Sequence, residues 1–358
     1  MGIIDELGGN FFTGVPDSLL APFCDYLMDS FGVSDKHVVA ANEGAAVGLA
    51  TGHYLATGEP GVVYMQNSGI GNAVNPICSL TKLYDVPIIY VIGWRGEPGV
   101  PDEPQHKFQG EITLAMLDCL QIPYKIVEDD VADVSDFKNF LSQGKSVAFV
   151  VKKSALKNEK IVNYPSQVAT MSREEILEII LASTASSDIF VCTTGKLSRE
   201  VFEIRERSQA GHEQDFLTVG SMGHSLMIAY GIALAKPSRR VFCLDGDGAA
   251  IMHMGSLAVV GVHKPKNLVH VVVNNGAHET VGGMPVVSKG LNLADVAKSL
   301  GYTDYRTNSV EELKNALASS KDGPIFIEAI SHLQSRKDLG RPTTTPHENK
   351  MDFMEFLS

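Results

Sequence analysis

The sequence predicts an α/β protein with two doubly wound parallel-sheet domains. In both halves of the chain, short apolar runs alternate with segments of helical spacing, which is typical of parallel sheets covered by helices on both faces. A polar stretch without periodicity separates the two series. With 358 residues, 44% of them hydrophobic and 20% charged, the chain is long and apolar enough for two domains with large cores.

The first series predicts a domain over residues 1–160. Its apolar runs predict strands at 38–41, 61–66, 86–92, 124–127 and 146–151. Helical spacing is clearest at 44–56 and 113–120. A polar segment over 154–170 follows and is expected to be a linker.

The second series predicts a domain over residues 171–358, including a C-terminal tail. It is expected to open with a helix capped by Ser172, because Glu174 and Glu175 in the first turn favour a helix start. Further helices are expected at 225–235 and 250–262. Strands are expected at 189–193, 216–219, 241–245, 268–274 and 324–329.

Composition excludes several classes of partner. The formal net charge of −12 argues against nucleic acid, whereas binding of a small anionic substrate depends on the local field. No apolar run reaches the length of a membrane span, and residues 1–10 lack the pattern of a leader, so we expect a cytoplasmic protein without a membrane partner. The five cysteines show no CxxC spacing and are interpreted as reduced core residues: Cys24, Cys78, Cys119, Cys192 and Cys243.

A split motif indicates a metal site in the second domain. Gly246-Asp247-Gly248 closes the apolar run 241–244, and Asn274-Asn275 closes the next run, 268–273. One helix-like segment lies between them, so both motifs should stand at the carboxyl ends of neighbouring parallel strands, where open α/β sheets bind ligands. Carboxylate, amide and carbonyl oxygens suit Mg²⁺, which bridges phosphate oxygens. The Gly-Asp-Gly alone is a weak signal, but its pairing with Asn-Asn is strong.

This pairing resembles the diphosphate- and metal-binding motif of thiamin diphosphate enzymes. The resemblance implies thiamin diphosphate and Mg²⁺ as cofactors. It implies that Asp247, the Asn275 side chain and the Ala277 carbonyl bind the metal. Residues Gly246, Gly248 and Ala249 would contact the cofactor. Many relatives carry serine where this chain has Ala249, so one diphosphate hydrogen bond is expected from elsewhere.

Glu43 stands at the junction between a strand and a helix of small residues. Taken alone, it could simply stabilise the helix start by about 0.3–1 kcal/mol. Thiamin enzymes carry a glutamate at this junction, and the segment 44–54 is similar to theirs. The resemblance therefore implies that Glu43 hydrogen-bonds the pyrimidine ring nitrogen and promotes the imino tautomer that removes the thiazolium proton.

The segment Val219–Gly223 lies between a strand and the expected helix 225–235. It could be a glycine-rich turn without a special role. The resemblance implies that Met222 is the aliphatic wedge that bends the cofactor and that the Gly220 carbonyl accepts from the aminopyrimidine. It also implies that the Thr194 hydroxyl donates to diphosphate.

Further segments resemble the phosphonopyruvate decarboxylase family, whose compact form lacks the middle domain of the larger thiamin enzymes. These segments are 13–20, 66–72, 92–99, 102–106, 274–279 and 338–346. The resemblance runs nearly end to end. It implies a carboxy-lyase that converts 3-phosphonopyruvate to phosphonoacetaldehyde and CO₂ in phosphonate biosynthesis.

An anionic phosphonate requires a pocket rich in cations or donors. Arg95, His106 and Lys107 lie in the segment 94–110, which we expect to be a loop because it is rich in Gly and Pro, and Arg341 lies in the tail. Arg95 is the leading candidate, since its planar fork can donate two parallel hydrogen bonds. Each of these residues could instead be a solvated charge, and Arg95 could be a structural anchor of its loop.

Other polar residues have two open interpretations. Asp17 and Ser18 could cap a helix that begins at Leu19. The resemblance instead favours proton handling by Asp17 together with His106, and substrate contact by Ser18. His278 and the following Glu279 could face the substrate or anchor the metal loop.

The alternatives belong to different classes. A sulfopyruvate decarboxylase would run the same chemistry on a sulfonate, and a carboligase would need an acceptor pocket. A non-catalytic thiamin-binding subunit is disfavoured by the presence of Glu43, Asp247 and Asn275 together. The resemblance also implies a homodimer or larger homo-oligomer with active sites at subunit interfaces.

Overall fold

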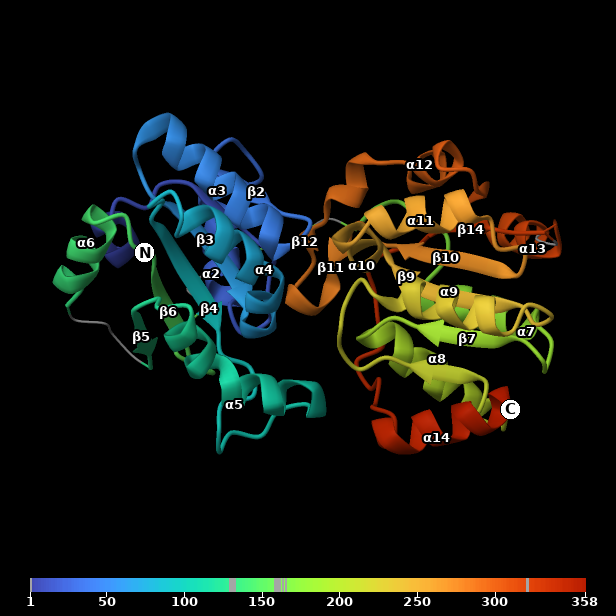
Figure 1. Ribbon diagram of the computed structural model, residues 1–358. Coiled ribbons are helices and arrows are strands. Elements are labelled where there is room, and N and C mark those ends of the chain that lie inside the picture. The colour runs from blue at the N-terminus through green and yellow to red at the C-terminus, as the bar shows by residue number, and fades with distance from the viewer. Residues whose placement is uncertain (1, 129–132, 158–161, 163, 165, 320–321) are drawn as a thin grey trace. The chain divides into compact units, whose positions relative to one another are not determined.

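The computed structural model describes residues 2–128, 133–157, 162, 164, 166–319 and 322–358 (Figure 1). The chain divides into two compact units. The first unit comprises Met1–Tyr164 and Thr280–Met284, and the second comprises Pro165–Glu279 and Pro285–Ser358. The predicted domain bounds stay a prediction, and part of the predicted linker lies outside the described residues.

The first unit is a parallel sheet with the strand order β2-β1-β3-β4-β6-β5. Its strands are β1 (Phe12–Gly14), β2 (His37–Val39), β3 (Gly61–Gln66), β4 (Ile88–Gly93), β5 (Tyr124–Val127) and β6 (Val147–Val151). Its helices are α1 (Gly2–Glu6), α2 (Ala21–Phe31), α3 (Glu43–Thr57), α4 (Ile70–Pro76), α5 (Pro104–Cys119) and α6 (Ser135–Ser142). A 3₁₀ turn (Asn67–Gly69) and a π turn (Ile77–Thr81) flank α4.

Successive side chains along the strands of the first unit alternate between two hydrophobic cores. In β3, Val62 and Tyr64 face a core shared with α1, α2 and α6. Val63 and Met65 face the opposite core, shared with α3, α4 and α5. Because successive strand residues point to opposite faces, one apolar run supplies both cores, as expected for a doubly wound sheet.

The second unit is a parallel sheet with the strand order β13-β14-β10-β9-β7-β8. Its strands are β7 (Ile189–Cys192), β8 (Asp215–Leu217), β9 (Val241–Gly246), β10 (Leu268–Asn274), β13 (Thr303–Thr307) and β14 (Ile325–Ile330). Its helices are α7 (Arg173–Ala182), α8 (Lys196–Arg207), α9 (Ser225–Ala235), α10 (Asp247–Met252), α11 (Gly255–His263), α12 (Leu293–Ser299), α13 (Val310–Ser319) and α14 (Pro346–Leu357). Short pieces are β11 (Ala277–His278), β12 (Met284–Pro285) and 3₁₀ turns at Glu279–Val281 and Val287–Gly290.

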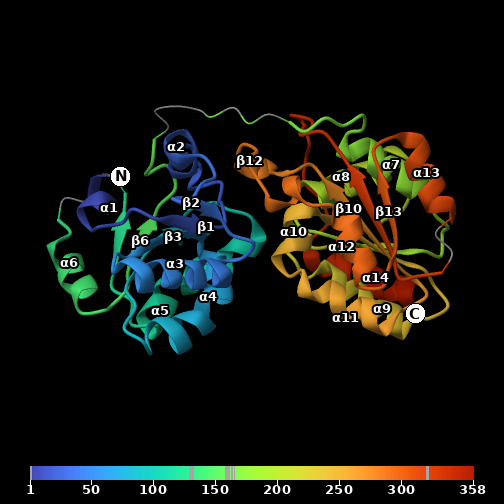
Figure 2. The ribbon, with the colours of Figure 1, turned by 90° about the horizontal axis from the view of Figure 1, so that it is seen from above.

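Helices cover both faces of the second sheet (Figure 2). Helices α7, α8 and α13 share a core with one face of the strands, while α9, α11 and α12 lie over the other face. The predicted fold class of two doubly wound α/β domains is therefore confirmed. Among the helices that the structure describes, none combines the length and apolar character needed to span a bilayer.

The neighbouring placement of the two metal-site motifs is confirmed by strand register. Strands β9 and β10 pair in parallel, with Val272 opposite Asp245 and Val273 opposite Gly246. Asp247 and Asn275 therefore follow adjacent strands at the same edge of the sheet. Ser172 caps α7 through a capping box with Glu175, as the sequence predicts for this helix start.

Three expectations about local structure are wrong. The segment 94–110 is not entirely loop, because Pro104 occupies the first turn of α5 and places His106 and Lys107 on that helix. The expected helix 250–262 is two helices, α10 and α11, which are separated at His253. Asp17 does not cap a helix at Leu19, since α2 begins at Ala21.

The cysteines depart in part from the expectation of five core residues. Cys24, Cys192 and Cys243 are buried, but Cys78 and Cys119 are exposed, so that interpretation is wrong for these two. Both lie in helical segments, where an apolar neighbourhood in sequence does not fix which face is buried.

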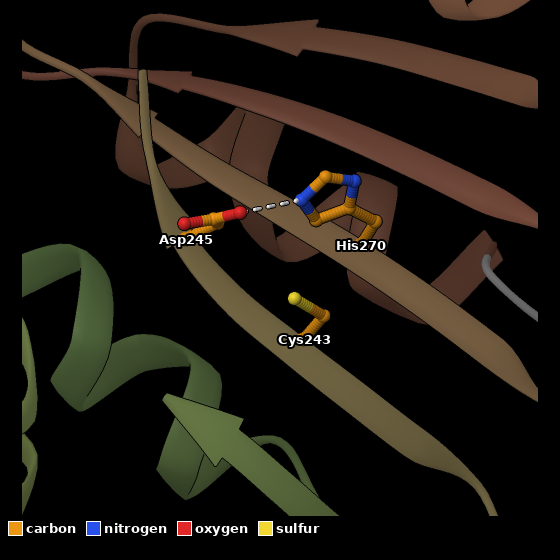
Figure 3. Close-up of side chains that lie close together, drawn as sticks. All are labelled: Cys243, Asp245 and His270. Carbon is orange, nitrogen blue, oxygen red and sulfur yellow. Dashed lines mark hydrogen bonds and ion pairs between the residues drawn. The ribbon is translucent and has the colours of Figure 1, made fainter. Parts of the chain in front are cut away.

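Cys243 also belongs to a buried polar group inside the second sheet (Figure 3). Asp245 on β9 and His270 on β10 point toward each other, and His270 Nε2 donates to Asp245 Oδ2 at 3.4 Å. The Asp245 carboxylate also accepts from the Gly246 backbone N–H at 3.0 Å. This pair joins two central strands just before the Gly-Asp-Gly motif.

Candidate active site

Asp247 is the first residue of α10 and its side chain points into the protein, with 4% of the residue exposed. Burial raises the pKa of Asp247 to about 6, and hydrogen bonds from the Ser288 hydroxyl and from the backbone N–H groups of Gly248 and Gly276 oppose that rise. The Gly276 contact places the carboxylate against the loop that carries Asn275. The partners that the described structure gives this carboxylate are hydroxyl and N–H groups rather than a cation.

The two asparagines that end β10 have different roles. Asn274 is buried, donates to Glu328 at 2.7 Å and accepts from the Gly276 N–H at 3.0 Å, so its amide is used within the fold. Asn275 accepts from the Ala277 N–H through Oδ1 at 3.0 Å and donates through Nδ2 to Glu279 at 3.3 Å. The Asn275 oxygen therefore lies on the inner side of a tight loop and keeps a lone pair for a ligand.

These donors fit a divalent cation. A buried carboxylate without a cationic partner is costly, and its raised pKa reports that cost. Mg²⁺ prefers hard oxygen ligands and is usually bound by one or two carboxylates together with phosphate oxygens. The Asp247 carboxylate, the Asn275 amide oxygen and the Ala277 carbonyl are the oxygens that could supply such a set.

Three further residues meet beside this loop. A Cβ built on Gly248 would lie 3.3 Å from the Met222 methyl group and 3.5 Å from His278 Cε1, so both side chains face the glycine. Burial lowers the pKa of His278 to about 4, which keeps its imidazole neutral. The φ of +85° at Gly223, where a Cβ would lie 2.7 Å from His253, turns the chain so that Met222 reaches this position.

Two threonines follow β7, and their hydroxyl groups have different surroundings. The Thr194 hydroxyl donates to the Val219 carbonyl at 2.7 Å, so its contact with diphosphate stays a prediction. The hydroxyl of the preceding Thr193 is buried and finds no partner among the described residues. Sequence analysis did not single out Thr193, because a hydroxyl at a strand end carries no signal of its own.

In the first unit, Glu43 is the first residue of α3 and only 5% exposed. Capping of the helix is done by Asn42, whose Oδ1 accepts from the Ala45 N–H at 2.8 Å. Glu43 Oε2 instead accepts from Asn72 Nδ2 at 2.8 Å. A Cβ on Gly69 would lie 2.5 Å from Glu43 Oε1, so the glycine makes room for the carboxylate.

The segment 67–72 therefore shapes the surroundings of Glu43. Gly69 and Asn72 contact the carboxylate, while the buried Asn67 donates to the Arg95 carbonyl and to the Thr113 hydroxyl, both at 2.8 Å. Asn67 thus ties the loop after β4 to helix α5. This use of Asn72 was not recognised in the sequence, although the segment itself was.

Asp17 lies at the carboxyl edge of the first sheet and is 3% exposed. Its Oδ2 accepts from the Leu19 N–H at 3.0 Å, and a Cβ on Gly93 would lie 2.5 Å from this oxygen. Burial raises the pKa of Asp17 to about 6, while the charge of Arg95 opposes the rise. A carboxyl group with this pKa can give or take a proton near neutral pH.

Arg95 is largely engaged within its loop. Its Nε and Nη2 donate to the two oxygens of Asp102 at 2.8 and 2.5 Å, and its Nη1 donates to the Ser18 hydroxyl at 2.9 Å. Although burial opposes it, the hydrogen bond from Arg95 lowers the pKa of Asp102. The bidentate pair favours a structural role for Arg95, the alternative left open by the sequence, and Nη1 donates only to the Ser18 hydroxyl among the contacts given for the described residues.

The remaining candidates for substrate contact lie on two different segments, α5 and the C-terminal tail. His106 is half-buried on α5, and burial together with Arg95 lowers its pKa. Lys107 is exposed and lines a hollow of about 280 Å³ with Glu97 and Glu111, two carboxylates that would oppose a phosphonate. Arg341 is exposed in the tail of the second unit.

The structure thus brings two sets of predicted residues together. Asp247, Asn275, Ala277, Met222, Gly248 and His278 meet in the second unit. Asp17, Ser18 and Arg95 meet in the first unit, and Glu43 lies in the same unit. Ser288, the partner of Asp247, was missed because a hydrogen bond between distant positions leaves no local pattern, and Asp102 was not recognised as the partner of Arg95.

Comparison with known proteins agrees with this geometry. The model of the thiamine pyrophosphate enzyme N-terminal TPP binding domain matches residues 2–117, and that of the C-terminal TPP binding domain matches residues 193–329. Phosphonopyruvate decarboxylase from Streptomyces viridochromogenes is 33% identical over 98% of this chain and 92% of the relative. The chain belongs to the phosphonopyruvate decarboxylase family of thiamine pyrophosphate enzymes. Phosphonopyruvate decarboxylase from Streptomyces hygroscopicus is also 33% identical, over 98% of this chain and 91% of the relative.

The sulfopyruvate decarboxylases are similar too. The beta subunit from Methanococcus maripaludis is 35% identical over 52% of this chain and 98% of the subunit. Membership of this family makes the protein an enzyme of the carboxy-lyase class that uses thiamin diphosphate to decarboxylate a keto acid.

Proposed function

We propose that this enzyme converts 3-phosphonopyruvate to phosphonoacetaldehyde and CO₂, with thiamin diphosphate and Mg²⁺, as a step of phosphonate biosynthesis. The observation that carries the substrate is the similarity over nearly the whole chain to two phosphonopyruvate decarboxylases. The observation that supports Mg²⁺ is the meeting of the buried Asp247 with the Asn275 loop at one sheet edge.

In this proposal the second unit holds the diphosphate end of the cofactor. Asp247, the Asn275 amide oxygen and the Ala277 carbonyl bind Mg²⁺, which neutralises the diphosphate. The positions that contact the cofactor are Thr194, Gly220, Met222, Gly246, Gly248 and Ala249. Met222 lies against Gly248, so its thioether can press on the cofactor from the side of the metal loop.

Thiamin diphosphate, when bound, supplies a carbon nucleophile and an electron sink for the electrons left by CO₂. Glu43 controls its activation by hydrogen-bonding the pyrimidine ring nitrogen. Asn72 donates to one oxygen of this carboxylate at 2.8 Å, and the other oxygen would face the cofactor. Burial of Glu43 strengthens that hydrogen bond, because little water competes with it.

Proton transfer and substrate binding are assigned to the first unit. Asp17, with a pKa of about 6, acts as the proton donor, and the half-buried His106 assists. The Arg95 Nη1 and the Ser18 hydroxyl provide adjacent donors for the phosphonate. The Asp102 partner offsets part of the Arg95 charge, so Lys107, His278 and Arg341 stay secondary candidates for this contact.

The proposal is tested by product release from three substrates. Purified protein supplied with thiamin diphosphate and Mg²⁺ is incubated with phosphonopyruvate, sulfopyruvate and pyruvate, and CO₂ and aldehyde are measured. We expect kcat/KM to be highest for phosphonopyruvate. A preference for sulfopyruvate would replace the proposal with the sulfopyruvate decarboxylase alternative, which the similarity to the M. maripaludis subunit supports. Bound cofactor without release of CO₂ from any 2-keto acid would indicate a non-catalytic subunit.

A further inference from the structure

Glu279 lies four residues after Asn275 and belongs to a network of ion pairs in the second unit. Its Oε2 accepts from Arg173 Nη1 at 2.5 Å, and its Oε1 accepts from Lys196 Nζ at 3.0 Å. Glu279 is therefore held as an anion in one place by cations from α7 and α8.

The same carboxylate contacts the amide of Asn275. Asn275 Nδ2 donates to Glu279 Oε2 at 3.3 Å. An ionised carboxylate can only accept hydrogen bonds, so it fixes which end of the amide is nitrogen and which is oxygen. The amide oxygen must then point the other way, toward the inside of the loop, where it accepts from the Ala277 N–H.

This orientation matters because Mg²⁺ binds the oxygen of an amide and not its nitrogen. We infer that Glu279, clamped by Arg173 and Lys196, is a positioning residue that presents the Asn275 oxygen to the metal. The inference rests on the proposed Mg²⁺ site. It extends that site to a carboxylate that does not touch the metal, in the way that outer partners orient ligands in other metal proteins.

The charges of the network suit this role. Arg173 also pairs bidentately with the buried Glu200, at 2.5 and 2.6 Å, and Lys196 also donates to the Ser335 hydroxyl at 2.7 Å. The two cations offset the two carboxylates. Glu279 therefore orients the amide without adding net negative charge to a site whose own charge comes from Asp247.

The test measures Mg²⁺ affinity directly. Apoprotein is titrated with Mg²⁺ at a fixed thiamin diphosphate concentration, and bound cofactor is followed by equilibrium dialysis. In Glu279→Ala, no acceptor remains for the Asn275 NH₂, so the contact that sets which end of this amide faces the metal is lost. We expect the Mg²⁺ concentration at half-saturation to rise about 10- to 100-fold. Glu279→Asp, which keeps the charge but draws it back from Asn275, should also weaken binding.

Two matched variants separate positioning from support of the fold. Glu200→Gln removes the other carboxylate partner of Arg173 without touching Asn275, so it should lower thermal stability and leave Mg²⁺ affinity near the parent value. In an Asn275→Asp background the metal ligand has two equivalent oxygens and no amide to orient. There, Glu279→Ala should weaken Mg²⁺ binding much less, because only the loss of one nearby negative charge remains.

The outcomes distinguish this inference from the proposed site. Equal weakening by Glu279→Ala in the Asn275 and the Asn275→Asp backgrounds would overturn the positioning role. Parent-like Mg²⁺ affinity in Glu279→Ala and Glu279→Asp, while Asp247→Ala loses Mg²⁺ dependence, would overturn it too. If Asp247→Ala keeps the Mg²⁺ dependence of the parent, the proposed metal site is wrong and the inference fails with it.

Discussion

The hydrogen bonds around Glu43 distinguish between the two roles that its carboxylate could have, at the helix start and toward the cofactor. The helix start is already capped by Asn42, whereas Glu43 is buried and bound by Asn72. We predict that Glu43→Gln still binds thiamin diphosphate but exchanges the proton on the reactive cofactor carbon at least about 10²-fold more slowly, because general acid–base contributions are typically about 10²–10⁴-fold. The exchange is followed by NMR after quenching. Exchange at the parent rate would leave Glu43 with only its part in the helix.

Asp17 should make the stability of the folded protein depend on pH in a way that an ordinary surface carboxylate does not. Its pKa is about 6 in the folded protein against an ordinary value of 3.8, so the folded state favours the protonated form. Its stabilising contribution is therefore fully present below about pH 4 and is lost as the pH rises through about 6. At about 1.36 kcal/mol per pKa unit, this shift corresponds to about 3 kcal/mol.

Asp17→Asn should accordingly unfold at higher urea than the parent at pH 8, with the difference vanishing near pH 4. The amide keeps an oxygen to accept from the Leu19 N–H, so the local turn is preserved. Urea unfolding at both pH values measures this. A difference that does not change with pH would mean that the Asp17 carboxylate is solvated and ionises normally.

At the scale of elements, apolar runs predict strands at the centre of a sheet and also the edge strand β5. Strands such as 61–66 and 268–274 are apolar on both faces and are recognised with the bounds that the structure has. The edge strand β13 (Thr303–Thr307) was missed, because only one face is buried and its residues are mostly polar. The start of α5 at Pro104 was missed because a Gly- and Pro-rich segment resembles loop until the proline occupies a first turn.

The site residues divide into those that the sequence indicates and those that only the structure shows. Asp247, Asn275 and Glu43 could be recognised because they stand at strand ends within local motifs. The partners Ser288 of Asp247 and Asn72 of Glu43 could not, since each lies on another element and only folding brings them together. Asp102 lies seven residues after Arg95 in the same loop, but its bidentate pairing with Arg95 leaves no pattern in the sequence.

The pair of Asp245 and His270 should stabilise the junction of β9 and β10. Replacing His270 by Leu leaves the buried Asp245 with its backbone partner alone among the described contacts, and should cost about 1–3 kcal/mol of unfolding free energy. Asp245→Ala and the double variant complete a thermodynamic cycle measured by urea unfolding. We expect the double variant to lose less than the sum of the single losses. Strict additivity would mean that the two side chains do not interact.

At the scale of the whole molecule, the proposed site needs residues from both units. Glu43 belongs to the first unit, and Asp247 with Asn275 belongs to the second. In a two-fold symmetric dimer, each site would combine the first unit of one chain with the second unit of the other. This arrangement is the central claim of the proposed function, because it makes one decarboxylation centre from the two sets of residues.

Subunit mixing tests this claim most directly. Inactive Glu43→Gln and Asp247→Ala chains are mixed under conditions of proven exchange, and CO₂ release from phosphonopyruvate is measured. A mixed dimer should carry one doubly altered site and one intact site, so we predict that part of the parent activity returns. Absence of any recovery in mixed dimers would contradict the claim and place both residues of each site in the same chain.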